Sequence, residues 1–288
     1  MGRRGLFLSG GVIVLALAGY TSGFAQVAWQ QVLSVIAVAG KPIAASPARL
    51  SDHEIQALDQ MTAQQQAELL LERAINHYDG ATEWIDKKVD SWYGSLQLAG
   101  QLNTLFTSAL NSNDLRVRAA AIEIDLAAYN VKKTPENVSL RIQALESGEG
   151  DRVTALWQLG LLGNRGVEPD RIFPVLLKYT RDSDAHIRHW AVEGLAYLGT
   201  DASIEPLLEI FRTDPSAEVR ERAACGLAQS GMLQQSQRMK AVPAFLNYLE
   251  DTSLDATMHQ WVLQALEDIS GKTLGDDPSA WRRWYNSR

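Results

Sequence analysis

Four arginines recur along this 288-residue chain at nearly even spacing, and together they could bind an anion. They are separated by 34, 36 and 32 residues: Arg118, Arg152, Arg188 and Arg220. Six residues before them stand Ser112, Glu146, Asp182 and Asp214. A carboxylate and a guanidinium group form strong charge-assisted hydrogen bonds. The fixed spacing therefore predicts that the arginines pair with acidic residues in the preceding turns and stabilise a repeated unit, and that they do not bind a ligand.

Two histidines and the single cysteine are the other groups that could do chemistry. His186 and His189 have a spacing that could hold a metal, but no second group of ligands accompanies them. Cys225 has no histidine near it in the sequence and lies among small residues, where a free cysteine acts as a small hydrophobic residue. The sequence also lacks a phosphate-binding loop, a nucleophile elbow and a dinucleotide-binding fingerprint. We therefore predict no catalytic residue, no metal site and no cofactor.

Trp190 is the leading candidate for a residue that binds a partner. The core-facing stripe of its predicted helix is already formed by Ile187, Ala191, Leu195 and Leu198. Trp190 lies off this stripe together with His189 and Glu193, and Arg222 takes the Trp190 position one repeat later. A large ring surrounded by charges is typical of an interface hot spot. The alternative is that Trp190 packs against the neighbouring repeat.

The turn Gly163–Gly166 is a second candidate for recognition. It links two predicted repeats and carries Asn164 and Arg165 between glycines. Turns on one rim of a repeat protein often bind partners. The alternative is a plain turn whose arginine caps helix carbonyls.

The elements that would position these residues are helix pairs. Pro174, Pro206 and Pro243 lie 32 and then 37 residues apart in similar apolar surroundings, and each is followed by an acidic turn and a second helical pattern. Repetition at this period is typical of stacked helix pairs. Glycines at the ends of three second helices are expected to be left-handed caps: Gly163, Gly199 and Gly231.

Proline in the first helix, Asp-x5-Arg across the turn and alanine in the second helix together resemble HEAT repeats. The stretches 182–199 and 214–231 match best, and the short repeats found in phycobilisome-lyase-type HEAT-like proteins are the most similar variety. The resemblance implies an all-α fold, a right-handed α-solenoid of about five HEAT-like helix pairs with helical caps. In layout the chain is similar to exported bacterial HEAT-repeat proteins without an assigned activity.

The N-terminus has the pattern of a secretory signal peptide. Arg3 and Arg4 precede an apolar run, and small residues end at Ala25. The alternative is that the uncharged segment 5–40 is retained as a membrane anchor. The predicted organisation is a signal peptide or anchor at 1–25, a linker at 26–50, an N-terminal helical cap at 51–94, HEAT-like repeats at 95–271 and a C-terminal cap at 272–288.

Composition narrows the choice of partner. The formal net charge is −7 and the sequence has no basic stripe, which argues against nucleic-acid binding. The leading prediction is a non-enzymatic interaction scaffold, periplasmic or secreted, that binds a protein or peptide on its concave helical surface. One alternative is an enzyme or enzyme subunit of the HEAT-like lyase type. Another is a membrane-anchored assembly factor, which requires that the N-terminal segment is retained.

Overall fold

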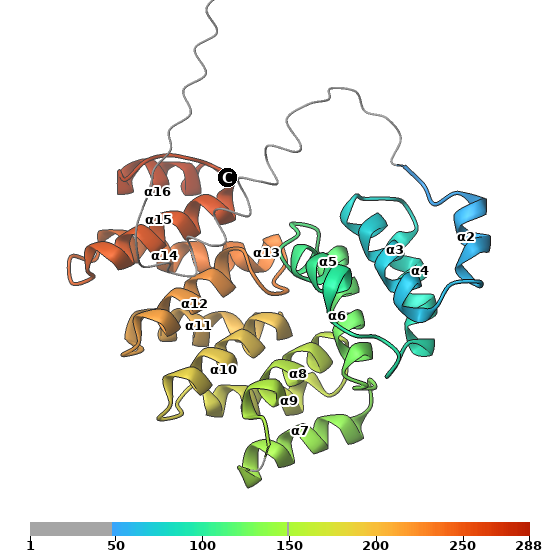
Figure 1. Cartoon of the computed structure of the whole chain (residues 1–288). Helices are drawn as coiled ribbons and strands as arrows, with labels where there is room; N and C mark the ends of the chain where they lie inside the picture. Colours follow the sequence, from blue (N-terminus) through green and yellow to red (C-terminus); the bar gives the residue numbers. More distant parts are fainter. Residues whose placement is uncertain (1–47, 149) are drawn as a thin grey trace, which may run out of the picture. The chain divides into compact units, whose positions relative to one another are not determined.

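A computed structural model describes residues 48–148 and 150–288, all within the unit Pro47–Arg288 (Figure 1). The predicted signal peptide or anchor and most of the predicted linker lie outside the described residues. The helices are α2 (Asp52–Leu58), α3 (Ala63–Ile75), α4 (Ala81–Lys88), α5 (Gly100–Leu110), α6 (Leu115–Ala128), α7 (Pro135–Ser147), α8 (Arg152–Asn164), α9 (Pro169–Tyr179), α10 (Ala185–Leu198), α11 (Ile204–Thr213), α12 (Ala217–Ala228), α13 (Gln235–Arg238), α14 (Val242–Glu250), α15 (Ala256–Ser270) and α16 (Pro278–Asn286). Short 3-10 turns η1 (Val89–Ser91), η2 (Asp201–Ser203) and η3 (Met239–Ala241) lie between them. The predicted all-α fold is confirmed.

Helix pairs stack on one another from α7 onward, as the proline period predicts. The second helices α8, α10, α12 and α15 are neighbours in that order, and the first helices α9, α11 and α14 pack against them (Figure 1). Their apolar faces form one continuous core. The repeated prolines lie in the first helices: Pro174 inside α9, Pro206 in the first turn of α11 and Pro243 near the start of α14. The HEAT-like solenoid is confirmed in this part of the chain.

The three glycines predicted to end second helices have different roles. Gly199 is the left-handed cap of α10, with φ of 67°, as predicted. Gly231 also has a positive φ, 69°, but lies beyond the end of α12. The prediction for Gly163 is wrong, because α8 continues through it. A Cβ on Gly163 would stand 2.4 Å from Leu198 Cδ1, so this glycine provides space between α8 and α10.

The N-terminal helices form a second apolar cluster, and α6 joins it to the repeats. Residues of α3, α4 and α5 pack around Trp92, which is 1% exposed. Ile124 of α6 belongs to this cluster, whereas Ile122 belongs to the core of the repeats. Arg118 of α6 donates from Nη1 to the carbonyl of Gly231 at 2.6 Å, in the segment after α12. As a result, α6 is buried on several faces and contacts residues more than a hundred positions away.

The last helix, α16, packs against α14. Trp281 is fully buried there, and its Nε1 donates to the carbonyl of Gly275 at 2.7 Å. Arg282 donates to both carboxylate oxygens of Glu250 on α14. Of the helices that the structure describes, none combines the length and the apolar character that a membrane span needs.

Candidate functional site

Two of the four repeated arginines, Arg152 and Arg188, pair with a carboxylate of the next repeat, which corrects the predicted pairing within one repeat. Arg118 and Arg220 instead donate to backbone carbonyls. Arg188 donates from Nε and Nη2 to Asp214 at 2.8 and 3.0 Å. Its Nη1 donates to the backbone carbonyl of Asp182, six residues earlier, at 3.0 Å. Arg152 likewise bonds the Asp182 carboxylate of the following repeat. The acidic residue six positions before Arg188 thus accepts a hydrogen bond through its backbone carbonyl. The carboxylate that pairs with Arg188 belongs to the next pair of helices.

These contacts shift the protonation equilibria in the direction expected for stabilising pairs. Hydrogen bonding to Asp214 raises the pKa of Arg188 against the effect of burial. Burial alone would raise the pKa of Asp182, but hydrogen bonds from the Asp184 amide and from Arg152 outweigh it and lower the pKa. Both groups are therefore held in their charged forms at neutral pH. These contacts between repeats, Arg152 with Asp182 and Arg188 with Asp214, form what we call the arginine ladder, and they account for both arginines without a bound anion.

Trp190 lies half-buried on α10 beside a second indole ring. The rings of Trp190 and Trp157, which is on α8, meet edge to face with centroids 6.1 Å apart. Trp157 also contacts the ring of Tyr197 at 4.6 Å. His186 and His189 border Trp190 at 6.4 and 5.8 Å. We call Trp157, Trp190, His186, His189 and Glu218 the Trp190 surface. Trp190 packs on the neighbouring repeat, as one prediction has it, but it is only half-buried and so remains accessible to a partner, as the other requires.

Glu193 and Arg222, two other predicted binding residues, form an ion pair with each other. Their side chains are only 15% and 19% exposed. Arg222 also donates to Ser230 Oγ at 2.5 Å, and its Nη1 lies 3.7 Å from Cys225 Sγ. Burial lowers the pKa of Arg222, but the Glu193 carboxylate outweighs this and raises it. The pair therefore presents little net charge at the edge of the Trp190 surface.

His189 contacts the carboxylate of Glu218 across the gap between α10 and α12. Its Nδ1 lies 3.3 Å from Glu218 Oε1. Burial lowers the pKa of His189, which favours the neutral ring at neutral pH. The Glu218 side chain is 74% exposed, so its carboxylate remains accessible to solvent or to a partner.

The second predicted recognition site lies elsewhere, at the end of α8. Arg165 donates from Nε to Glu123 Oε1 at 2.7 Å, and Lys133 bonds the other oxygen of the same carboxylate at 2.8 Å. Glu123 is almost fully buried, so the two cations neutralise a charge inside the protein. Asn164 is the last residue of α8, and its Oδ1 is buried without a hydrogen-bond partner among the described groups. A role for Asn164 and Arg165 in recognition stays a prediction.

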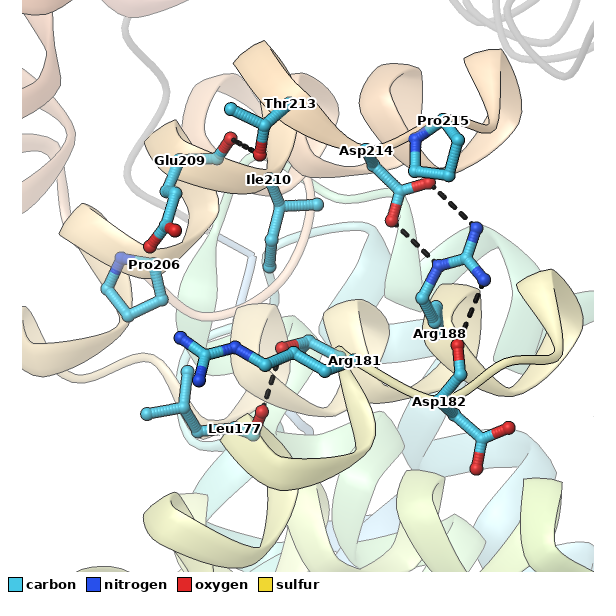
Figure 2. Close-up of a pocket in the computed structure, with 11 residues that line it drawn as sticks. Leu177, Arg181, Asp182, Arg188, Pro206, Glu209, Ile210, Thr213, Asp214 and Pro215 are labelled. Carbon is cyan, nitrogen blue, oxygen red and sulfur yellow. Dashed lines mark hydrogen bonds and ion pairs between the residues drawn. The ribbon is translucent and has the colours of Figure 1, made fainter.

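A groove of about 310 Å³ lies between the turn after α9 and helix α11 (Figure 2). Its lining residues include Leu177, Arg181, Pro206, Glu209 and Ile210, and the Arg188–Asp214 pair lies beside it. The Arg181 guanidinium extends between Leu177 and Pro206 and makes no ion pair with a described residue. The groove thus combines apolar side chains with charged ones, among them Arg181 and Glu209, and sequence reasoning did not single it out.

Sequence reasoning also missed Asp125, Trp157 and Glu123. A signal for Asp125 was present, because it stands four residues after Ala121, at the position that the other repeats fill with Leu159, Leu195 and Leu227. A polar residue at a leucine position of a core stripe is an anomaly. Trp157 and Glu123 stand at equivalent positions in successive repeats, but their contacts join helices far apart in sequence.

Residues 138–228, from α7 to the end of α12, match the family model described as HEAT repeats. The matched stretch carries Trp157, Trp190 and the arginine ladder, and it supports a HEAT-repeat protein. HEAT repeats commonly serve as scaffolds for protein interactions, and the match indicates no catalytic family. No curated protein matches the chain.

Proposed function

We propose that this protein is a non-enzymatic interaction scaffold that binds a protein or peptide on the concave surface of its second helices, at the Trp190 surface. The observation that carries the proposal is the half-buried Trp190, which packs edge to face on Trp157 and is bordered by two histidines. Aromatic rings that are already held in place lose little conformational freedom on binding and are enriched at interface hot spots.

The charges around Trp190 fit the same role. Glu193 and Arg222 neutralise each other. A partner that covers them therefore does not have to remove an unpaired charge from water. The exposed Glu218 carboxylate can pair with a cationic group at the rim of the interface, where charges affect association rate and specificity. A partner segment with an apolar side chain flanked by a basic residue would complement this arrangement.

The finer parts of the proposal rest on the sequence. The signal-like N-terminus favours a periplasmic or secreted protein of bacterial type, and the repeat spacing favours the short HEAT-like variety. Retention of the N-terminal segment would instead place the same scaffold at a membrane.

Affinity purification of the mature protein from its native host, followed by mass spectrometry, tests the proposal. The expected result is a partner that co-purifies in a fixed ratio and that binds the purified protein directly in a titration. If a purified partner binds equally well to a variant with Trp190 and Trp157 replaced by Ala and with its fold intact, the Trp190 surface is not the binding site.

A further inference from the structure

Asp125 is a buried carboxylate without a cationic partner among the residues that the structure describes. It lies on α6, where the residue is 3% exposed. Its Oδ2 accepts a hydrogen bond from Trp157 Nε1 at 3.3 Å, and its Oδ1 has no hydrogen-bond partner among the described groups. Removing a carboxylate from water without a counter-ion strongly disfavours its charged form.

Other buried acidic groups in this part of the protein have cationic partners. Glu123 has two, Glu193 pairs with Arg222, and Asp214 accepts two hydrogen bonds from Arg188. The Asp125 carboxylate is different, because the hydrogen bond that it accepts within the described part of the chain is a long one from a neutral indole. Burial raises the pKa of Asp125 to about 7, and the hydrogen bond from Trp157 opposes this rise.

The charged and titratable groups on the helices around α6 face other partners. On the side of α4 and η1, burial raises the pKa of Asp86 and of Tyr93, and the nearby Glu123 charge adds to both rises. Arg165, after the end of α8, pairs with Glu123 itself. On α3, Arg73 pairs with Glu54 and Glu72. Burial lowers the pKa of Arg118, on α6, and raises that of Tyr197, on α10, and each of these two groups also acts electrostatically on the other. None of these groups bonds Asp125 in the described part of the chain.

The Asp125 contact leads directly to the Trp190 surface. Trp157 joins the two, since its indole N–H faces Asp125 and its ring contacts Trp190 and Tyr197. An ionised carboxylate is a stronger acceptor than a carboxylic acid and must also gain water or another donor. Ionisation of Asp125 would therefore strengthen the hydrogen bond from Trp157 and, at the same time, require water or another donor at the unpartnered Oδ1 between α6 and α8.

We propose that the protonation of Asp125 controls the position of Trp157 and thereby regulates the Trp190 surface. The neutral acid fits the dry contact between α6 and α8 seen in the structure, whereas the carboxylate holds the Trp157 N–H more tightly and brings water or another donor to Oδ1, which moves the indole ring. The effect on partner binding rests on the proposed function above, whereas the effect on Trp157 does not.

Nuclear magnetic resonance on the purified protein labelled with ¹⁵N-tryptophan tests the proposal. The indole N–H signal of Trp157, assigned by comparison with Trp157→Phe, is followed from pH 5.5 to 8.5. The expected result is a titration with a midpoint near 7 that disappears in Asp125→Asn. A Trp157 signal that stays constant in the wild type, or that titrates unchanged in Asp125→Asn, would overturn the proposal.

Two further variants make the experiment decisive. Asp125→Leu, the residue of the other repeats at this position, replaces Asp125→Asn if the latter does not fold, and it should also abolish the titration. Asp268→Asn is the matched control, because Asp268 is another poorly exposed aspartate with an unpaired oxygen and should leave the Trp157 titration unchanged. A lost titration in Asp268→Asn would contradict the assignment to Asp125.

The connection to the surface is tested separately on Trp190. Since His186 and His189 also border this ring, its signal is followed in a variant with both histidines replaced by Gln. The Trp190 signal should still shift with a midpoint near 7. If it stays constant there while Trp157 titrates, Asp125 does not regulate the Trp190 surface. No binding partner takes part in these measurements, so their failure is distinct from failure of the proposed function.

Discussion

Arg188 donates two hydrogen bonds to the carboxylate of Asp214, which belongs to the following repeat and lies 26 residues later in the chain. Both residues are buried. Because Asp214 also accepts from the Ser216 amide at 2.8 Å, the pair fixes the turn between α11 and α12 and locks it to α10. The repeats are therefore joined by polar contacts as well as by their apolar faces.

Arg188→Ala should destabilise the protein by about 3 kcal/mol, because it leaves the buried Asp214 carboxylate without its cation. Urea unfolding of the variant and the wild type at pH 7 measures this difference. Arg212→Ala is the control, since Arg212 is 55% exposed and lies 3.7 Å from Asp251, and it should cost less than about 1 kcal/mol. An unchanged midpoint for Arg188→Ala would contradict a structural role for the ladder.

Asp125→Asn should remove a pH dependence of stability. The pKa of Asp125 is raised to about 7 in the folded protein by burial, so between about pH 4 and 7 the folded state keeps a proton that the unfolded state has lost. Protonated Asp125 therefore contributes its full share to the free energy of unfolding below pH 4. This contribution falls as the pH rises to about 7, by roughly 4 kcal/mol in total.

The measurement is the free energy of unfolding of Asp125→Asn relative to the wild type at pH 5, 6, 7 and 8. The variant should gain relative stability up to about pH 7 and then no more. Asp90→Asn, on an exposed residue of η1, should show no such trend. A difference between Asp125→Asn and the wild type that does not change with pH would show that Asp125 is ionised throughout.

Gly160→Ala tests the closest approach of α8 and α10. A Cβ at Gly160 would stand 2.6 Å from the carbonyl oxygen of Gly194, and backbone cannot move aside cheaply. The clash should outweigh the helix propensity gained, for a net loss of about 2 kcal/mol. Gly226→Ala is the matched helical control, because its Cβ would stand 3.0 Å from the Ala196 Cβ. Gly226→Ala should be the milder change, and the reverse order in thermal unfolding would contradict this packing.

The N-terminus of the mature protein should be Gln26, because the arginine pair, the apolar run and the small residues before it form a signal-peptide pattern. N-terminal sequencing of protein from the native host checks this. A start at Gly40 would mean that cleavage instead follows the small residues Ala37 and Ala39. Full-length chain in the membrane fraction would show that the segment is retained as an anchor.

Much of the fold could be predicted because it depends on local sequence and on a period. The prolines and the Asp-x5-Arg spacing identified the helix pairs, and the core stripe Ile187, Ala191, Leu195 and Leu198 is buried as predicted. Pairing between repeats was harder. Asp214 follows Arg188 by 26 residues, because the repeat is 32 residues long and the acidic residue stands six residues before the next arginine. Only the stacked helices show that the carboxylate which pairs with Arg188 comes from the next repeat.

The candidate site could be predicted only in part. The helical pattern placed Trp190 off the core stripe, where the structure has it half-buried. Its contacts with Trp157 and the link from Trp157 to Asp125 depend on how α6, α8 and α10 pack. Arg165 looked free in a turn between glycines, whereas its carboxylate partner Glu123 lies 42 residues away on α6. A local sequence pattern does not predict contacts between residues so far apart in the chain.

The affinity of an identified partner for Trp190→Ala tests the central claim most directly. Glu209→Ala, in the groove of Figure 2, is measured alongside, and the thermal stability of both variants is compared with the wild type. We expect Trp190→Ala to weaken binding by about 2 kcal/mol, roughly thirtyfold, with its fold retained and with Glu209→Ala binding normally. Normal binding by a folded Trp190→Ala variant, above all together with lost binding by Glu209→Ala, would contradict this claim.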